Sequence, residues 1–322
     1  MSQPNKTVSY ISAVFAGLLV FALLFAFVDP DQVFEAAKRV DPLLLAVAMI
    51  PLSLEVICTS LRVQHCVNRP VPFSLAMYSN AIYMTWLSIL PARLGELAGI
   101  AVFNSRLGMP MGSAIASVVV QRIYDVLILS GLLVAMLSQT LYGGTTGFVI
   151  ACIVLFVLIS VLLTLPFWLS QIARLLISFR HRAILKRLLF VCLQARTWYR
   201  HQSAPRAITW LAGTTLAKWI VNLIAVYIVF RACGIELDGY LITTVGILMH
   251  FLGAIPVQSF GGFGASDVGL AGILASLNVS AELAVATSII FRLVVLSFVG
   301  LFFTFCFTLI RPQLNQEIHR NS

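Results

Sequence analysis

The chain has 322 residues, of which 60% are hydrophobic and only 10% are charged, with a net charge of +9 and a mean hydropathy of +0.98. A soluble domain carries about 25% charged residues, so this composition excludes a soluble globular protein and indicates a polytopic membrane protein. The basic residues gather in one segment, which makes the charge a signal of membrane topology and argues against a nucleic-acid partner. We expect one all-α transmembrane domain over residues 1–322, in a bacterial cytoplasmic (inner) membrane.

Apolar stretches of about 20 residues are long enough to cross a bilayer. Such stretches begin near Val8, Leu43, Phe73, Gly112, Gly147, Ala207, Tyr240 and Ala281. The first has no small-residue cleavage site and is followed by acidic residues, so we interpret it as a retained helix and not as a signal peptide.

Residues 171–206 contain basic residues and no acidic residue, which predicts a cytoplasmic loop. The basic residues are Arg174, Arg180, Arg182, Lys186, Arg187, Arg196, Arg200 and Arg206. The same segment alternates basic and apolar residues and then reaches Trp198 and Tyr199, a pattern that is also typical of a helix lying in the membrane interface. With this segment inside, residues 61–72, which include Arg62 and Arg69, are also expected on the cytoplasmic side, and both termini are expected in the cytoplasm.

Successive loops fall on the sides of the membrane that their charges predict only if the stretches around Pro91 and Pro256 do not cross the membrane completely. We expect each to form a re-entrant helical hairpin, over about residues 73–105 from the cytoplasm and about residues 240–278 from outside. Non-helical backbone at membrane depth must be buried in protein or line a wet cavity. This leaves about six full transmembrane helices and two hairpins.

The two halves of the chain, residues 1–138 and 147–310, show the same order of features. Pro91, Gly95 and Glu96 precede Arg122 in the first half; Pro256, Gly264 and Asp267 precede Arg292 in the second. The spacing from carboxylate to arginine is 26 positions in one half and 25 in the other. Three full crossings per half turn the second copy upside down, which predicts an inverted-topology repeat with a site near the midplane.

Charged residues at predicted membrane depth number four of each sign: Glu55, Arg93, Glu96, Arg122, Asp125, Lys218, Asp267 and Arg292. If all were unpaired they would cost about 20–28 kcal/mol, more than the stability of a typical fold, about 5–15 kcal/mol. They must therefore pair or contact water. Arg122 and Asp125 share one helix face at i and i+3 and are expected to support each other.

Glu96 and Asp267 each follow a glycine at the start of a short helix, where a carboxylate complements the positive helix end. They are candidates for capping or for neutralising arginines as much as for contacting a substrate. Arginine stays charged and binds phosphate with a planar fork, so Arg93, Arg122 and Arg292 predict a site for a phosphate-bearing headgroup. Glu55 and Lys218 are possible secondary sites or a buried structural pair. The glycines at 95, 262 and 264 are expected to allow close backbone approach.

The segments "LPARLGE", "QRIYD" and "SFGGFGASD", followed by Arg292, resemble the flippase-like transmembrane domain of lysylphosphatidylglycerol synthases. The resemblance covers nearly the whole chain. Two positions depart from the family pattern: Asp267 stands where glutamate is usual, and Gln121 stands where a glutamate is common. The resemblance implies translocation of an aminoacylated or otherwise modified anionic phospholipid. We find no counterpart of the soluble aminoacyl-transfer domain and expect no lysyl transfer.

Our hypothesis is therefore a lipid flippase or scramblase-like transporter for an anionic phospholipid or a lipid-linked glycan, and not an enzyme. The expected substrate-binding residues are Arg93, Glu96, Arg122, Asp125, Asp267 and Arg292. No catalytic residue, metal or cofactor is expected; the six cysteines lack metal-type spacing. Two alternatives stay open: a scaffold that recruits a lipid-modifying enzyme or glycosyltransferase through residues 171–206, and a polyprenyl-phosphate transferase. A homo-oligomer is also left open.

Overall fold

The computed structural model describes residues 29–67, 70–91, 94–177, 190, 192–193, 204–255 and 263–310. Helices form the regular structure of these residues, and no strand is formed among them, which confirms the predicted all-α class. The expected first span near Val8 and most of residues 171–206 lie outside the described residues.

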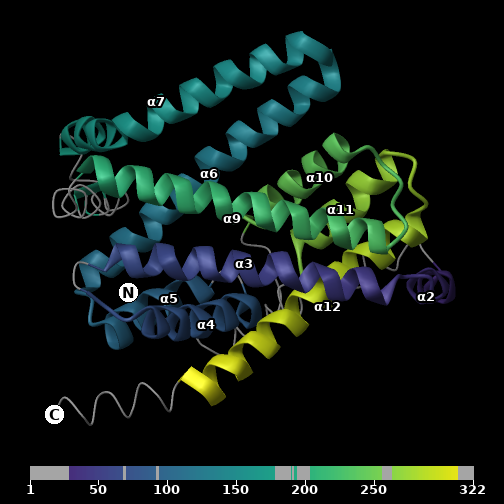
Figure 1. Ribbon diagram of the computed structural model, residues 1–322, viewed down its shortest axis with the longest axis horizontal. Helices are drawn as coiled ribbons and strands as arrows, with labels where there is room; N and C mark the ends of the chain where they lie inside the picture. Colours follow the sequence, from purple (N-terminus) through teal and green to yellow (C-terminus); the bar gives the residue numbers. More distant parts are fainter. Residues whose placement is uncertain are drawn as a thin grey trace, which may run out of the picture. The chain divides into compact units, whose positions relative to one another are not determined.

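Long apolar helices account for five of the expected spans (Figure 1). They are α3 (Pro42–Cys66), α6 (Met111–Tyr142), α7 (Gly144–Ile177), α9 (Ala204–Ala232) and α12 (Ala281–Phe305), the last continued by the π-helical turn η3 (Cys306–Ile310). By length and composition, each contains a segment able to cross a bilayer. Each begins within three residues of the position predicted from hydropathy.

Shorter helices occupy the two predicted hairpin regions. They are α4 (Phe73–Ile89) and α5 (Leu94–Leu107) in the first region, and α10 (Gly239–Leu252) and α11 (Ala265–Ser276) in the second. Each is shorter than the roughly 20 residues that a crossing needs. The first break contains Pro91, whose missing N–H cannot continue a helix. The structure therefore contains the helix–break–helix pattern, and the re-entrant path through a membrane stays a prediction.

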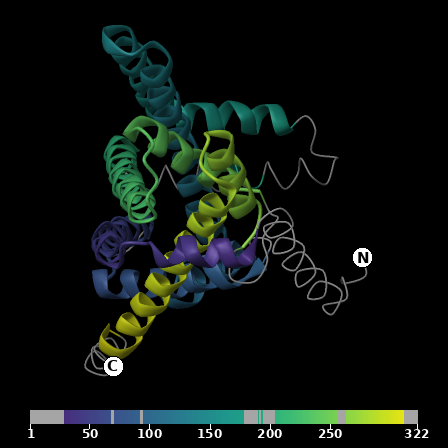
Figure 2. The same ribbon diagram turned by 90° about the vertical axis from the view of Figure 1, so that its right-hand side faces the viewer.

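The chain divides into two compact units, and unit 1 comprises Met1–Ser53, Tyr83–Ala98 and Val221–Phe305. In unit 1, α11 packs against α10 and α12, and α2 (Pro30–Lys38) lies across α12 (Figure 2). The backbone N–H of Asp41, after α2, donates to the carbonyl of Ala232 at the end of α9, at 2.9 Å. The largest fully buried apolar side chains of this unit are Phe230, Ile235, Ile242 and Ile247.

Unit 2 comprises Leu54–Ile82, Gly99–Ile220 and Cys306–Ser322. Its α6 and α7 pack against each other as a helical hairpin (Figure 1). The turn between them uses Gly143 and Gly144, with φ of 60° and 45°, a region that glycine enters without steric cost. The Ser138 hydroxyl then donates to the carbonyl of Gly147 across the hairpin at 3.1 Å. Tyr124, in the middle of α6, is fully buried and shows where the interior of this unit lies.

Candidate functional site: a buried charge cluster in unit 2

Asp125, in the middle of α6, is the centre of a cluster of charged side chains in unit 2. Its Oδ1 atom accepts hydrogen bonds from Arg62 Nη1 at 2.9 Å and from Trp219 Nε1 at 3.0 Å. The same oxygen lies 3.3 Å from Lys218 Nζ. Its Oδ2 lies 3.5 Å from Arg122 Nη1. We call Arg62, Arg122, Asp125 and Lys218 the Asp125 cluster; its members come from α3, α6 and α9.

The i, i+3 pair predicted from the sequence is present in this cluster, because Arg122 and Asp125 meet on one face of α6. Beside it, Arg62 Nη2 donates to the carbonyl of Gln121 at 3.2 Å. The Gln121 side chain is buried and donates from Nε2 to Ser117 Oγ at 3.1 Å. At this departure from the family pattern, the structure therefore holds a neutral amide in a local hydrogen bond.

Arg62 was placed wrongly from its position near the end of an apolar stretch. It was expected with residues 61–72 on the cytoplasmic side, whereas α3 continues to Cys66 and the Arg62 side chain is only 1% exposed and bonded to Asp125. The error arose because arginines near the end of a span usually mark the cytoplasmic side. The apolar residues of "LRVQHC" that carry the helix onward were the signal that could have corrected it. The partner of Lys218 was also missed, because Asp125 lies 93 positions away in the chain.

The cluster is unbalanced in charge. Three cations surround the single Asp125 carboxylate, and Lys218 also lies over the Trp219 ring, 3.9 Å from its centroid. Glu55, on α3, is half-buried and interacts electrostatically with Lys218. Charged groups within the apolar part of a membrane protein are costly and are frequently functional. Several cations gathered at one carboxylate are therefore a candidate site for an anionic group.

A second charge pair lies in unit 1, between α11 and α12. Arg292 approaches Asp267 with two nitrogens, Nε at 3.1 Å from Oδ1 and Nη2 at 3.0 Å from Oδ2. Arg292 Nη2 also donates to Ser266 Oγ at 2.9 Å. The Asp267 side chain is buried, and the Arg292 side chain is 17% exposed.

Asp267 also completes the start of α11. Its Oδ2 accepts the backbone N–H of Gly264 at 2.8 Å, which is one half of a capping box. Its carbonyl accepts the Ser288 hydroxyl from α12 at 3.0 Å. The carboxylate therefore both caps the helix and neutralises Arg292, the two structural roles that the sequence analysis had kept beside the substrate-binding role.

Glu96, the predicted counterpart of Asp267, lies in the first turn of α5 and accepts a hydrogen bond from the Tyr83 hydroxyl at 3.1 Å. The preceding Gly95 faces the backbone of α4. A Cβ at that position would overlap Leu87 and would stand 2.7 Å from the carbonyl oxygen of Trp86. The absence of a Cβ at Gly95 therefore allows the backbones of α4 and α5 to lie close together.

The remaining predicted site residues are placed unevenly. Pro91 is buried, and Gly264 precedes α11, whereas Arg93, Pro256 and Gly262 lie outside the described residues. Arg122 and Asp125 belong to unit 2, and Asp267 and Arg292 belong to unit 1. The expectation that three arginines hold one headgroup stays a prediction.

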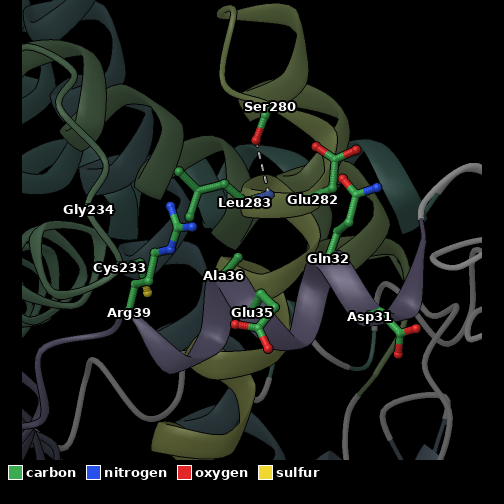
Figure 3. Close-up of a pocket in the computed structure, with 10 residues that line it drawn as sticks. All are labelled: Asp31, Gln32, Glu35, Ala36, Arg39, Cys233, Gly234, Ser280, Glu282 and Leu283. Atoms are coloured by element: carbon green, nitrogen blue, oxygen red, sulfur yellow. Dashed lines mark hydrogen bonds between the residues drawn. The ribbon is translucent and has the colours of Figure 1, made fainter.

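A hollow of about 540 Å³ lies within unit 1, between α2, the end of α9 and the start of α12. Its lining includes the carboxylates of Asp31, Glu35 and Glu282, with Arg39 as the basic residue among its lining residues. Figure 3 shows that these carboxylates do not converge on one point. We therefore assign it no ligand and treat the Asp125 cluster as the candidate site.

Comparison with known proteins supports a membrane lipid-related function. The glycosyltransferase AglD of Haloferax volcanii is 24% identical over 132 residues, which cover 40% of this chain and 21% of that protein. The matched region is thus about a fifth of the length of that relative. No solved structure matches. The family described as the lysylphosphatidylglycerol synthase TM region matches residues 11–302. The chain therefore belongs to the family of lysylphosphatidylglycerol synthase transmembrane regions.

Proposed function

We propose that this protein is a flippase or scramblase-like transporter that moves an anionic or aminoacylated phospholipid, or a related phosphate-bearing lipid, between membrane leaflets. The observation that carries the proposal is the Asp125 cluster, where three cations on apolar membrane-type helices share one carboxylate. A lipid headgroup that crosses the apolar layer needs polar contacts along its path. Arginine and lysine side chains gathered at one carboxylate would provide these contacts for a phosphate.

The helix breaks support the same proposal. The two pairs of short helices would enter and leave the membrane on one side, as broken helices do around the substrate sites of many transporters. In such an inverted repeat, the site would be reached alternately from each leaflet. The proposed localisation is the bacterial inner membrane, with both termini in the cytoplasm.

A second candidate function rests on the match to AglD, whose name describes a glycosyltransferase. In this alternative, the chain would move a lipid-linked glycan between leaflets, or would recruit a glycan- or lipid-modifying enzyme to the membrane. A polyprenyl-phosphate transferase is the third possibility. It would be recognised by product formation from a purified donor.

The test is leaflet exchange in proteoliposomes with headgroup-labelled phosphatidylglycerol and its lysyl form. We expect protein-dependent exchange that Arg122→Ala abolishes. Arg106→Ala serves as the matched control, because Arg106 is an exposed cation in the last turn of α5. Folding of each variant is checked by size-exclusion chromatography.

Two results would contradict transport. One is an absence of exchange for every anionic lipid and lipid-linked glycan tested. The other is exchange that Arg122→Ala leaves unchanged. Loss of cellular function on neutralising residues 171–206, with Arg122 dispensable, would instead support the scaffold.

A further inference from the structure

His250 is an ionisable side chain in the last turn of α10, and the proposed lipid site does not use it. Its Nε2 atom lies 2.6 Å from Asn222 Oδ1, on α9. Asn222 is buried and His250 is half-buried, and both belong to unit 1. Ionisable side chains are rare within apolar membrane helices, where they frequently belong to ion pathways or proton relays. The His250–Asn222 pair is therefore a candidate for such a role.

Two glycines of α10 bring this helix close to α9. A Cβ at Gly246 would stand 3.0 Å from Val226 Cγ1, and a Cβ at Gly239 would stand 3.8 Å from Tyr227 Cε2. Gly246 precedes His250 by four positions, so the two residues lie on the same face of α10. The close approach at Gly246 therefore places the imidazole beside α9, where it meets the amide.

The end of α10 also packs against the start of α11. A Cβ at Gly253 would stand 3.8 Å from Ser266 Cβ. Ser266 in turn accepts a hydrogen bond from Arg292 at 2.9 Å. His250 precedes Gly253 by three positions. A charge gained by His250 would therefore be added at the junction of α10 and α11.

The charged and titratable side chains on the two helices packed against α10 have partners. Within three turns of Asn222 on α9, and on α11, these side chains are Lys218, Tyr227, Arg231 and Asp267. Lys218 is bonded to Asp125, Arg231 to the Tyr227 hydroxyl, and Asp267 to Arg292. The group that meets the His250 ring from α9 is instead a neutral amide. A proton that binds to this ring therefore adds a positive charge that the amide does not neutralise.

An asparagine partner suits both protonation states of an imidazole. A proton on Nε2 is donated to Asn222 Oδ1 in the neutral ring and also in the protonated ring. The second proton enters at Nδ1, and the hydrogen bond from Nε2 then becomes charge-assisted and stronger. The pair can thus gain and release one proton, exchanged with water, while α9 and α10 stay joined.

We infer that His250, held by Asn222, is a proton-binding site that couples lipid movement to a proton gradient. Histidine is the side chain whose charge ordinarily changes between pH 5 and 8, so its protonation can follow a pH difference across a membrane. The charged and neutral rings favour different packing at the junction of α10 and α11, and a proton therefore shifts the population between the two arrangements. The inference rests on the proposed function and adds its energy source.

The first experiment detects the proton directly, in the full-length protein in detergent. Histidine rings are labelled with nitrogen-15, spectra are recorded by NMR between pH 5 and 8, and the signal that disappears in His250→Gln is assigned to His250. We expect this signal to pass from a neutral imidazole protonated at Nε2 to an imidazolium. A ring that keeps one protonation state throughout would overturn the inference.

The second experiment applies a pH gradient to proteoliposomes that contain headgroup-labelled phosphatidylglycerol or its lysyl form. If one proton moves with each lipid, one pH unit can enrich the label in one leaflet up to about tenfold, which corresponds to about 1.4 kcal/mol. We expect severalfold enrichment by the wild type and its loss on addition of a protonophore. His250→Gln should still exchange lipid but without enrichment, because glutamine can donate to Asn222 and cannot bind a proton.

The matched control is His65→Gln, which removes a histidine in the last turn of α3. It should leave the enrichment unchanged. Enrichment that persists in His250→Gln, or that His65→Gln abolishes equally, would overturn the coupling. Wild-type exchange without enrichment would keep transport and refute the coupling. An absence of all exchange, with the His250 ring still titrating, would refute transport and keep the proton-binding site.

Discussion

Asp125 and Asp267 are both buried aspartates that accept hydrogen bonds from arginine, yet they lie at different positions in their helices. Asp267 lies in the first turn of α11, where one of its oxygens accepts the Gly264 N–H and one arginine completes the neutralisation. Asp125 lies in the middle of α6, where backbone N–H groups are already used by the helix. The carboxylate oxygens of Asp125 therefore accept hydrogen bonds from side chains of three helices.

The difference separates a structural ion pair from a candidate ligand site. Asp267 and Arg292 balance one charge with one charge and also join α11 to α12. In the Asp125 cluster, three cations of the described part of the chain share one carboxylate. A one-to-one ion pair is sufficient as a structural link, whereas several cations gathered at one carboxylate are the arrangement that we propose for contact with an anion.

The largest expected difference between the two aspartates appears when each carboxylate is removed. Asp125→Ala leaves three cations without their shared partner, and we expect it to lower the free energy of unfolding by about 3–5 kcal/mol. Asp267→Ala loses a helix cap and one ion-pair partner, and we expect a smaller loss of about 2 kcal/mol. The measurement is unfolding of the purified protein in mixed micelles by titration with a denaturing detergent. Equal losses at the two positions would contradict the distinction.

The sequence was sufficient for the features that depend on local pattern. Hydropathy located the starts of α3, α6, α7, α9 and α12, and Pro91 located the first helix break. The spacing of Arg122 and Asp125 predicted their contact, because three positions on a helix share one face.

The sequence was insufficient where tertiary contacts decide. Arg62 was interpreted as a topology signal, and only its hydrogen bond to Asp125 shows that it is the nearest cation to this carboxylate among the described residues. Lys218 and Trp219 meet the same carboxylate from more than 90 positions away. No local pattern encodes which distant helix supplies a partner, so the Asp125 cluster could not be assembled from spacing alone.

A second prediction concerns one side chain that donates a hydrogen bond to Asp125. Trp219→Phe removes the indole N–H and keeps an aromatic ring beside Lys218. Because hydrogen bonds to charged groups contribute about 1.5–3 kcal/mol, we expect a loss of stability in that range. The control is Trp86→Phe, at an exposed position of α4, which should stay within about 0.5 kcal/mol of the wild type. A Trp219→Phe variant as stable as the control would show that Asp125 does not depend on this donor.

The smallest expected effect comes from exchanging arginine for lysine in each region. Arg292 uses two nitrogens on the two oxygens of Asp267 and also reaches Ser266, a geometry that the single ammonium of lysine cannot reproduce. We expect Arg292→Lys to lower the stability by about 1–2 kcal/mol. Arg122 makes a 3.5 Å contact to Asp125 one turn away, so Arg122→Lys should change stability by no more than about 0.5 kcal/mol.

If the fork of Arg122 serves a phosphate, the same substitution will still weaken phosphatidylglycerol binding, because lysine offers a point charge in place of two parallel N–H groups. Stability would then depend on the geometry of Arg292, and binding on the geometry of Arg122. If Arg122→Lys and Arg292→Lys both changed stability and neither changed binding, the two regions would not differ in function.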